Sequence, residues 1–259
     1  MPRFALELEF DGQGFSGTQL QDDASRTLQG VVETALADLA GSPVRFLPAS
    51  RLDQGVSSPA LPGDCVLERD WDPAMLAAAL NQRLPEDAVV RRAARVADGF
   101  SARRDASAKH YRYRVLVRPA RPVIDRRCLW VRRWSRPEAL PEMAALLVGR
   151  LDLSGFACKR GDASDDGDPR RRYDHASWTD DGDGAWTFAM AGEGFLYQQI
   201  RGLVGAMVHV ALDRAPIGDF RAAIAGGWGA RRLGNMAPGI GLRLARVDFT
   251  PEPDWRDTR

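Results

Sequence analysis

Alternating hydrophobic and polar positions open the chain and predict its first element. Apolar and polar side chains alternate from residue 3 to residue 10, a period of two that indicates a half-buried strand. From Leu28 to Leu39 the apolar residues recur at three- and four-residue spacing, which predicts a helix. Thr27 is suited to cap its start and Gly41 to end it. Residues 44–47 then predict a strand that leads into a loop around Asp53.

The same kinds of signal continue to residue 105. Asp72 followed by Pro73 predicts a helix start, because aspartate caps the first turn and proline fits within it. An apolar stripe follows through residue 80, and the valine-rich residues 89–96 return to extended structure. The order strand, helix, strand, strand, helix, strand is the ferredoxin-like pattern.

A second copy of this order is predicted in the remainder of the chain. Residues 111–117 alternate as a strand, residues 137–148 carry a helical stripe, and two strands at 173–179 and 186–190 flank an Asp/Gly-rich turn. A long helix over 196–212 and a strand over 242–249 complete the order. We therefore expect an α+β protein of two ferredoxin-like lobes, residues 1–105 and 106–259.

Three less regular segments carry predictions of their own. Residues 159–172 are dense in Asp, Gly and Arg, which predicts a flexible loop, and the residues from Pro251 onward predict a loose tail. Pro59 and Pro62 cannot donate ladder hydrogen bonds, so the strand after the Asp53 loop is expected to begin late, near Cys65.

Composition narrows the class of protein. The chain has 259 residues, of which 44% are hydrophobic, and no apolar stretch long enough for a membrane helix. Its N-terminus runs straight into a charged alternating strand, which is not typical of a signal peptide. We expect a soluble cytoplasmic protein with no membrane partner. The three cysteines and three histidines lack ligand spacing, so no metal is expected.

Charge is segregated along the chain although the net charge is only +1. Arginines and lysines gather in several stretches, whereas aspartates concentrate around 162–168 and 180–183. A chain that segregates charge in this way can present one basic cleft while another face offsets the total, although each stretch by itself is also typical of a solvated strand or loop face. The basic stretches include Arg103, Arg104, Lys109, Arg170, Arg171 and Arg172.

The stretch Ala49-Ser50-Arg51-Leu52-Asp53-Gln54-Gly55-Val56 is the strongest candidate site. A loop with Asp53 at its tip exposes one carboxylate, and Gly55 permits the bend that keeps it accessible. By itself the Arg-x-Asp-x-Gly pattern is also typical of an ordinary surface turn with a solvated ion pair.

Seven segments of the chain carry motifs in a fixed order. They are Phe10–Gln21, Arg51–Val56, Leu80–Pro85, Phe100–Arg103, Lys109–Tyr113, Phe195–Gly205 and Ala237–Leu242. Together they resemble the tRNA pseudouridine synthase A (TruA) family. In order, they resemble the family's opening Asp-Gly segment, its catalytic Arg-x-Asp-x-Gly-Val motif, its Leu-Asn-x-x-Leu-Pro, its Phe-x-Ala-Arg, its Lys/Arg-x-Tyr-x-Tyr strand, its Arg-containing apolar helix and its closing Ala-Pro-x-x-Gly-Leu.

The resemblance implies a fold and an activity. Members of the family have a central cleft between their two lobes, act as homodimers and isomerise uridine to pseudouridine in the anticodon stem-loop of tRNA, in the region of positions 38–40. The reaction needs a carboxylate and no cofactor. The implied partners are therefore tRNA and a second copy of the chain. With tRNA as the partner, the basic residues that we expect to contact RNA are Arg103, Arg104, Lys109, Arg170, Arg171 and Arg172.

The resemblance also assigns roles to single residues. Asp53 matches the catalytic aspartate, Arg51 the arginine that contacts RNA and helps to extrude the target nucleotide, and Tyr111 the tyrosine that stacks on the flipped base. Arg201 matches the basic residue that pairs with the aspartate. Because a charge on an apolar helix face needs a partner, the residue pattern by itself also leads us to expect a carboxylate near Arg201, with Asp53 as the natural candidate.

Departures from the family pattern surround the predicted site. Thr18 stands where tryptophan is usual, Ser50 for glycine, Leu52 for threonine and Ser57 for histidine. A tRNA-binding paralogue whose catalysis is lost or retargeted is therefore the second hypothesis. A carboxylate-dependent nucleoside or glycoside enzyme is the third, but no second carboxylate stands beside Asp53 in the sequence.

Overall fold

The fold was analysed in a computed structural model that describes residues 1–21, 25–161 and 167–258. These residues form two compact units. The first unit consists of residues 1–109 together with 243–259, and the second of residues 110–242. The expected division, 1–105 and 106–259, differs in placing the closing segment with the second lobe.

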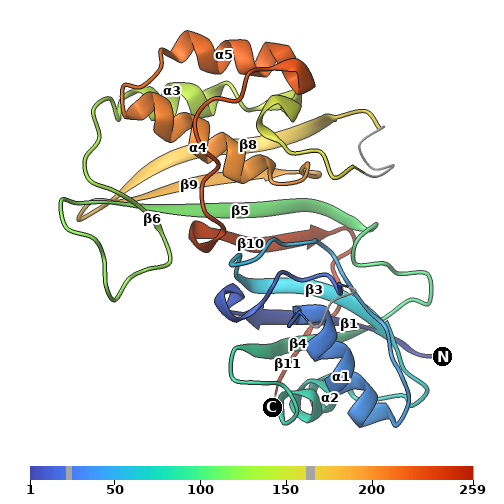
Figure 1. The fold of residues 1–259 in the computed structure, drawn as a ribbon. Coiled ribbons are helices and arrows are strands. Elements are labelled where there is room, and N and C mark those ends of the chain that lie inside the picture. The colour runs from blue at the N-terminus through green and yellow to red at the C-terminus, as the bar shows by residue number, and fades with distance from the viewer. Residues whose placement is uncertain (22–24, 162–166, 259) are drawn as a thin grey trace. The chain divides into compact units, whose positions relative to one another are not determined.

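The first unit has the element order predicted for a ferredoxin-like fold (Figure 1). Its sheet has the order β11-β4-β1-β3-β2, and each pair of neighbouring strands in it is antiparallel. Helices α1 and α2 lie side by side along it. The bounds are β1 (Arg3–Phe10), α1 (Leu28–Ala40), β2 (Phe46–Pro48), β3 (Ser58–Val66), α2 (Pro73–Asn81), β4 (Ala88–Val96), β10 (Leu242–Phe249) and β11 (Arg256–Asp257).

The helix caps predicted from the sequence are present. The Thr27 hydroxyl accepts a hydrogen bond from Gly30 N at 3.2 Å, and Asp72 Oδ1 accepts one from Met75 N at 3.0 Å. Gly41 ends α1 with φ of 73°, a left-handed conformation in which glycine is favoured. These caps satisfy backbone donors that a helix start leaves without a partner, so local sequence fixes where both helices begin.

Strand β3 corrects one prediction. It begins at Ser58 rather than near Cys65 and runs beside β1 through both prolines. Pro62 still takes part in the ladder as an acceptor, because Ala49 N donates to its carbonyl oxygen at 2.8 Å. The register with β2 continues to place Ala49 opposite Pro62, whose missing N–H leaves Ala49 O without a ladder donor. Lys109 Nζ donates to Ala49 O instead, at 2.9 Å.

The closing segment of the chain corrects a second prediction. Instead of a loose tail, Arg256–Asp257 form β11 and pair antiparallel with β4. The Trp255 ring lies under the Arg92 guanidinium, 4.8 Å from carbon to ring centroid. The Thr258 hydroxyl lies 2.7 Å from Arg91 O. A two-residue strand is determined by such contacts and not by a periodic pattern.

The second unit is built on a second sheet with helices of its own (Figure 1). Within residues 110–242, β5 lies beside β9, β9 beside β8 and β8 beside β7, while β6 runs parallel to β5. The bounds are β5 (Ala106–Val117), β6 (Leu129–Val131), α3 (Ala139–Ala145), β7 (Gly149–Asp152), β8 (Arg170–Gly182), β9 (Ala185–Gly192), α4 (Gln199–Ala211) and α5 (Ile217–Gly226). Helices α3, α4 and α5 pack on one another, and α3 packs on β8.

The α+β class with antiparallel sheets is thus confirmed. The apolar face predicted for residues 111–117 is buried at Tyr111, Tyr113 and Val115. No helix among the described residues is both long and apolar enough to cross a membrane.

Candidate active site

Asp53 lies in a tight turn between β2 and β3. Val56 N donates to Asp53 O at 3.1 Å, and Gly55 takes φ of 81°, the bend that the sequence predicts there. The Asp53 side chain is half-buried, while Arg51 is exposed. A carboxylate at the tip of a turn that its own backbone closes is held in place and still accessible to a substrate.

Hydrogen bonds from Thr18 anchor the turn on the side that precedes Asp53. The Thr18 N–H donates to Leu52 O at 3.0 Å, and its hydroxyl accepts from Leu52 N at 2.8 Å. The same hydroxyl oxygen lies 3.5 Å from Ser50 O, at the limit for donation. Thr18 is only 1% exposed, so these bonds form away from water. Both peptide groups that precede Asp53 are therefore fixed by a residue from the segment between β1 and α1.

Hydrogen bonds of Ser57 anchor the turn on the side that follows Asp53. The Ser57 hydroxyl accepts from Gly12 N at 3.0 Å and donates to Asp11 Oδ1 at 3.3 Å. Its carbonyl accepts from Leu244 N at 3.2 Å, which ties β10 to the same point. A Cβ added at Gly12 would lie 2.2 Å from Val56 O, so only glycine allows the backbone to approach the turn this closely.

Lys109 provides a third contact with this region. Its Nζ donates to Ala49 O at 2.9 Å. Burial, with a smaller contribution from the Arg103 charge, lowers the pKa of Lys109 to about 8. The side chain is thus engaged inside the first unit at the entrance to the Asp53 turn, and its expected contact with RNA stays a prediction.

The departures from the family pattern have definite places in the structure. Leu52 is 7% exposed and packs in the core, and Thr18 and Ser57 make the hydrogen bonds just described. Ser50 is buried, and its hydroxyl has no hydrogen-bond partner among the residues described. Three of the four departures are therefore integrated with the turn. Thr18, Ser57 and Lys109 were not identified from the sequence as residues that anchor the turn by hydrogen bonds. The one signal in the sequence was that Thr18 and Ser57 depart from the family pattern within segments that otherwise match it.

Tyr111 and Tyr113 lie on the same face of β5 in the second unit. Tyr113 is fully buried, and its hydroxyl donates to Pro238 O at 2.7 Å. Burial raises the pKa of the Tyr113 phenol. Tyr111 is 8% exposed and meets Phe195 edge to face, with ring centroids 5.0 Å apart. Tyr113 is a core residue with a satisfied hydroxyl, whereas Tyr111 lies at the less buried end of the row.

Arg201 lies in the first turn of α4 and is half-buried. Its Nε donates to Ala237 O at 2.8 Å, and Ala237 N donates back to Arg201 O at 3.1 Å. The helix is thereby joined to the Ala-Pro segment that closes the family pattern. Asp53 and Arg51 belong to the first unit and Tyr111 and Arg201 to the second, and the convergence of Asp53 with Arg201 stays a prediction.

The arginines expected to bind RNA lie at two places. Arg103 and Arg104 are exposed in the segment before β5, where Arg104 Nη2 donates to Gly99 O at 2.9 Å. Arg170 to Arg172 form the start of β8 opposite β7, so the predicted flexible loop cannot extend to residue 172. Arg172 pairs with Asp174 at 3.1 Å on the strand surface. Part of the predicted loop, residues 162–166, lies outside the described residues.

Metal-ligating side chains are dispersed: the described residues contain no group of three or more His, Cys, Asp or Glu placed to hold an ion. The chemistry that the site can offer comes from one carboxylate in an anchored turn and from arginines nearby in sequence.

Comparison with known proteins gives consistent matches. A profile of the tRNA pseudouridine synthase family matches residues 143–250. The chain is 38% identical over 255 residues to tRNA pseudouridine synthase A of Methylobacterium sp. (strain 4-46), a match that covers 98% of this chain and 99% of that protein. It is 35% identical over 256 residues to tRNA pseudouridine synthase A of Thermus thermophilus, with 97% and 98% covered.

Among solved structures, the chain matches one of an archaeal box H/ACA sRNP Nop10–Cbf5 complex with 11% identity and a TM-score of 0.38. The match covers 93% of this chain and 48% of the other.

Proposed function

Since this chain belongs to the tRNA pseudouridine synthase A family, we propose that it isomerises uridine to pseudouridine in tRNA. It is an isomerase of the pseudouridine synthase class. Its substrate region is the anticodon stem-loop, positions 38–40 by family implication. The profile match over residues 143–250 lies mostly in the second unit, and the first unit carries the anchored carboxylate.

The reaction moves one glycosidic bond within a nucleotide. The C1′–N1 bond breaks, the freed uracil turns, and a C1′–C5 bond forms. C5 loses its proton and N1 gains one, so atoms and charge balance with no oxidant or reductant. A carboxylate that is ionised at neutral pH can serve as nucleophile or as proton acceptor in this sequence.

Asp53 is the residue to which we assign the carboxylate chemistry. The observation that carries the assignment is the anchoring of its turn by Thr18 on one side and Ser57 on the other. Such anchoring keeps a reacting group within a narrow range of positions, which is how proteins prepare a group for catalysis. The turn leaves the Asp53 side chain half-exposed.

Other roles follow for three further residues. Arg51, exposed two residues before Asp53, is placed in sequence to contact the RNA backbone beside the extruded nucleotide. Tyr111 offers an aromatic ring for the flipped base, for which stacking is worth about 1–3 kcal/mol. Arg201 is held at the Ala237 carbonyl and is the proposed ion-pair partner of Asp53. Flipping costs a few kcal/mol of lost stacking, so these contacts are of the size required.

The finer assignments of the partner and the compartment belong to the proposal as well. We propose that the chain works as a homodimer on tRNA in the cytoplasm. Arg103, Arg104, Lys109 and Arg170 to Arg172 are the proposed phosphate contacts, and Lys109 also donates to Ala49 O.

Asp53→Asn tests the assignment, because it keeps the shape of the side chain and removes its charge. Pseudouridine formation in tRNA is expected to fall by at least about 10³-fold, while affinity for tRNA and the melting temperature stay close to wild type. Asp70→Asn is the matched control, since Asp70 is exposed and its ion pair is with Arg95. Near-normal turnover by the Asp53 variant would remove Asp53 from the mechanism.

The same assay decides the retargeted-paralogue hypothesis. A wild-type chain that binds tRNA tightly and forms no pseudouridine would support it. The hydrogen bonds of Thr18 and Ser57 argue for a working turn, because both departures hold the carboxylate's backbone instead of releasing it.

A further inference from the structure

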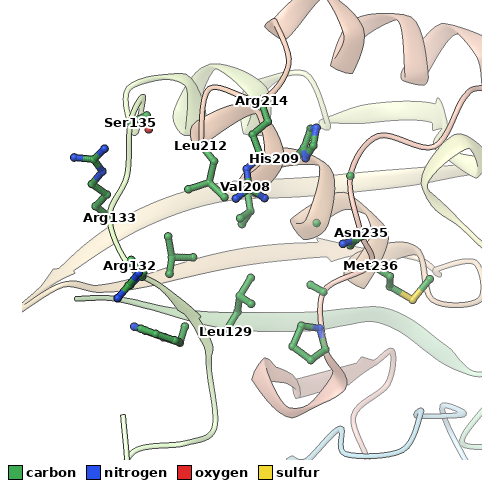
Figure 2. Close-up of a pocket in the computed structure, with 16 residues that line it drawn as sticks. Leu129, Arg132, Arg133, Ser135, Val208, His209, Leu212, Arg214, Asn235 and Met236 are labelled. Carbon is green, nitrogen blue, oxygen red and sulfur yellow. The ribbon is translucent and has the colours of Figure 1, made fainter. Parts of the chain in front are cut away.

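A pocket of about 590 Å³ lies in the second unit, apart from the residues assigned above (Figure 2). Its walls are β6 with the segment that follows it, the C-terminal half of α4, and residues 234–238. Leu129, Val208 and Leu212 contribute apolar surface to it.

The walls of this pocket are fixed by backbone contacts. A Cβ added at Gly205 would lie 2.0 Å from Asn235 O, so residues 234–238 rest directly on α4. The paired bonds between Arg201 and Ala237 hold the same segment at its other end. The pocket is thus preformed, and a ligand does not have to order it.

The charges around the pocket are of one sign. Arg132, Arg133 and Arg214 line it together with His209, and its lining contains no aspartate or glutamate. Within the described part of the chain these three arginines make no side-chain hydrogen bond or ion pair. Figure 2 shows Arg133 extending outward, whereas Arg214 reaches from the segment after α4 toward Val208.

Two exposed arginines near the pocket are paired with carboxylates: Arg136 lies 3.5 Å from Asp213, and Arg221 lies 2.8 Å from Glu142. Arg132, Arg133 and Arg214 differ from these two because they line one pocket whose lining holds no carboxylate. Three guanidinium groups around one pocket can bind an anion from outside.

A neighbouring pocket of about 630 Å³ extends this basic surface. It shares His209, Arg214, Gly234 and Asn235 with the first pocket. It adds Arg231 and Arg232, with Asp219 as its one carboxylate. Arg214 stands at the boundary of the two, so a ligand longer than a single anion can follow one arginine to the next.

We propose that this pair of pockets binds a stretch of RNA backbone, with phosphates at Arg132 and Arg214 and a sugar or base against Leu129 and Leu212. The combination of apolar surface with guanidinium groups fits a nucleotide chain better than free phosphate, which has no apolar part. That the RNA is tRNA rests on the proposed function. The pocket is then a second place of contact with the substrate, outside the residues around Asp53.

A double variant, Arg132→Gln with Arg214→Gln, tests the proposal in the full-length protein. We expect its dissociation constant for unmodified tRNA to rise about tenfold at moderate salt, and the log–log salt slope to flatten by about 1.4–1.8, which is two phosphates at about 0.7–0.9 each. The matched control is Arg136→Gln with Arg221→Gln, which removes the same charge from paired positions and is expected to change affinity by less than about twofold.

The outcomes separate this proposal from the proposed function. If wild type forms no pseudouridine in tRNA but the pocket variant still loses RNA affinity, the function fails and the pocket stands. If wild type is active and the pocket variant binds tRNA as tightly as wild type, the pocket proposal is overturned.

Two further measurements close the alternatives. The first is calorimetry with inorganic phosphate on wild type and on the pocket variant. If wild type binds phosphate, the variant does not, and the variant's affinity for tRNA is unchanged, the pocket is a small-anion site and the proposal is overturned. Sedimentation that shows a change of oligomeric state in the pocket variant, with no change in salt slope, would assign the surface to a second copy of the chain and overturn it as well.

Discussion

Thr18 is buried and holds the proposed catalytic carboxylate of Asp53 through the two peptide groups that precede it. Its hydroxyl accepts from Leu52 N at 2.8 Å, and its own N–H donates to Leu52 O at 3.0 Å. A buried donor that loses its acceptor costs about 1–3 kcal/mol, and the peptide at Leu52 is joined directly to Asp53. Position of the carboxylate and stability of the turn are therefore coupled at this residue.

Thr18→Val and Thr18→Ser form a matched pair that separates these effects. The valine keeps the branched shape and removes the hydroxyl, so we expect kcat to fall about tenfold or more with little change in KM for tRNA. The serine keeps the hydroxyl and is expected to restore most of kcat. Steady-state kinetics on both variants is the measurement. Equal kcat in the two, or a loss confined to KM, would mean that Thr18 only packs.

Lys109 gives the stability a predictable dependence on pH. Its pKa in the folded protein is about 8, below that of a free lysine at about 10.4, so between these values the unfolded chain binds more protons. Stability therefore rises with pH across that window, and the penalty of burying the charged amine is fully present below pH 8. Thermal melting of wild type against Lys109→Met, from pH 6 to pH 10, isolates this group.

The expected result is a difference between the two melting temperatures that is constant from pH 6 to about pH 7. Above pH 8 it shifts in favour of wild type. A difference that stays flat through pH 10 would show that the amine is solvated, and that its contact with Ala49 O does not persist in solution.

At the scale of elements, periodic segments were predictable and contact-dependent ones were not. The helix predicted from Leu28 to Leu39 and the strand predicted over 111–117 follow from their own apolar spacing, and the structure has them within α1 (Leu28–Ala40) and β5 (Ala106–Val117). Helix α5 was not predicted, because only Phe220 and Ala223 of its ten residues are buried and its apolar stripe is weak. Likewise, β11 is a strand only because it pairs with β4, and no local sequence pattern predicts that pairing.

The strand β11 yields a prediction of its own. Deleting residues 255–259 removes the Trp255 contact with Arg92, the Thr258 hydroxyl bond and the cover on the edge of β4. A cation–π contact contributes about 0.5–1 kcal/mol and a hydrogen bond about 1, so we expect a loss of about 1–3 kcal/mol in unfolding free energy.

Thermal melting and light scattering of the truncated chain provide the check. The exposed edge is expected to promote aggregation near the melting temperature, because an uncovered edge strand can pair with another chain. A truncated protein that melts and scatters like wild type would show that the tail contributes nothing, as its sequence alone suggests.

For the molecule as a whole, the positions of its arginines determine where the chain can bind a polyanion, because the net charge of +1 supplies almost no overall attraction. The candidate site was predictable to the extent that Arg51, Asp53 and Arg201 stand in recognisable motifs. The hydrogen bonds that anchor the turn, such as those of Thr18 with Leu52 and of Ser57 with Gly12, could not be predicted. Each joins segments more than thirty residues apart in the sequence, and no local pattern indicates such a contact.

Salt dependence of binding tests the whole-molecule expectation for Arg103 and Arg104. Replacing both with glutamine is expected to flatten the log–log slope of tRNA affinity against salt by roughly two units at most, to a similar degree for different tRNAs. Stability is expected to change by less than about 1 kcal/mol, since both are exposed. An unchanged slope would place the RNA elsewhere on the chain.

The return of residues 243–259 to the first unit has a consequence for how the protein is made. Ser57 O accepts from Leu244 N and the Ser58 hydroxyl donates to Leu244 O, so the turn that carries Asp53 is completed by residues synthesised after the whole of residues 110–242. Domains usually fold in order as they leave the ribosome. Here the first unit cannot be completed until residue 244 has been synthesised. A chain that stops before residue 244 therefore lacks the finished carboxylate turn.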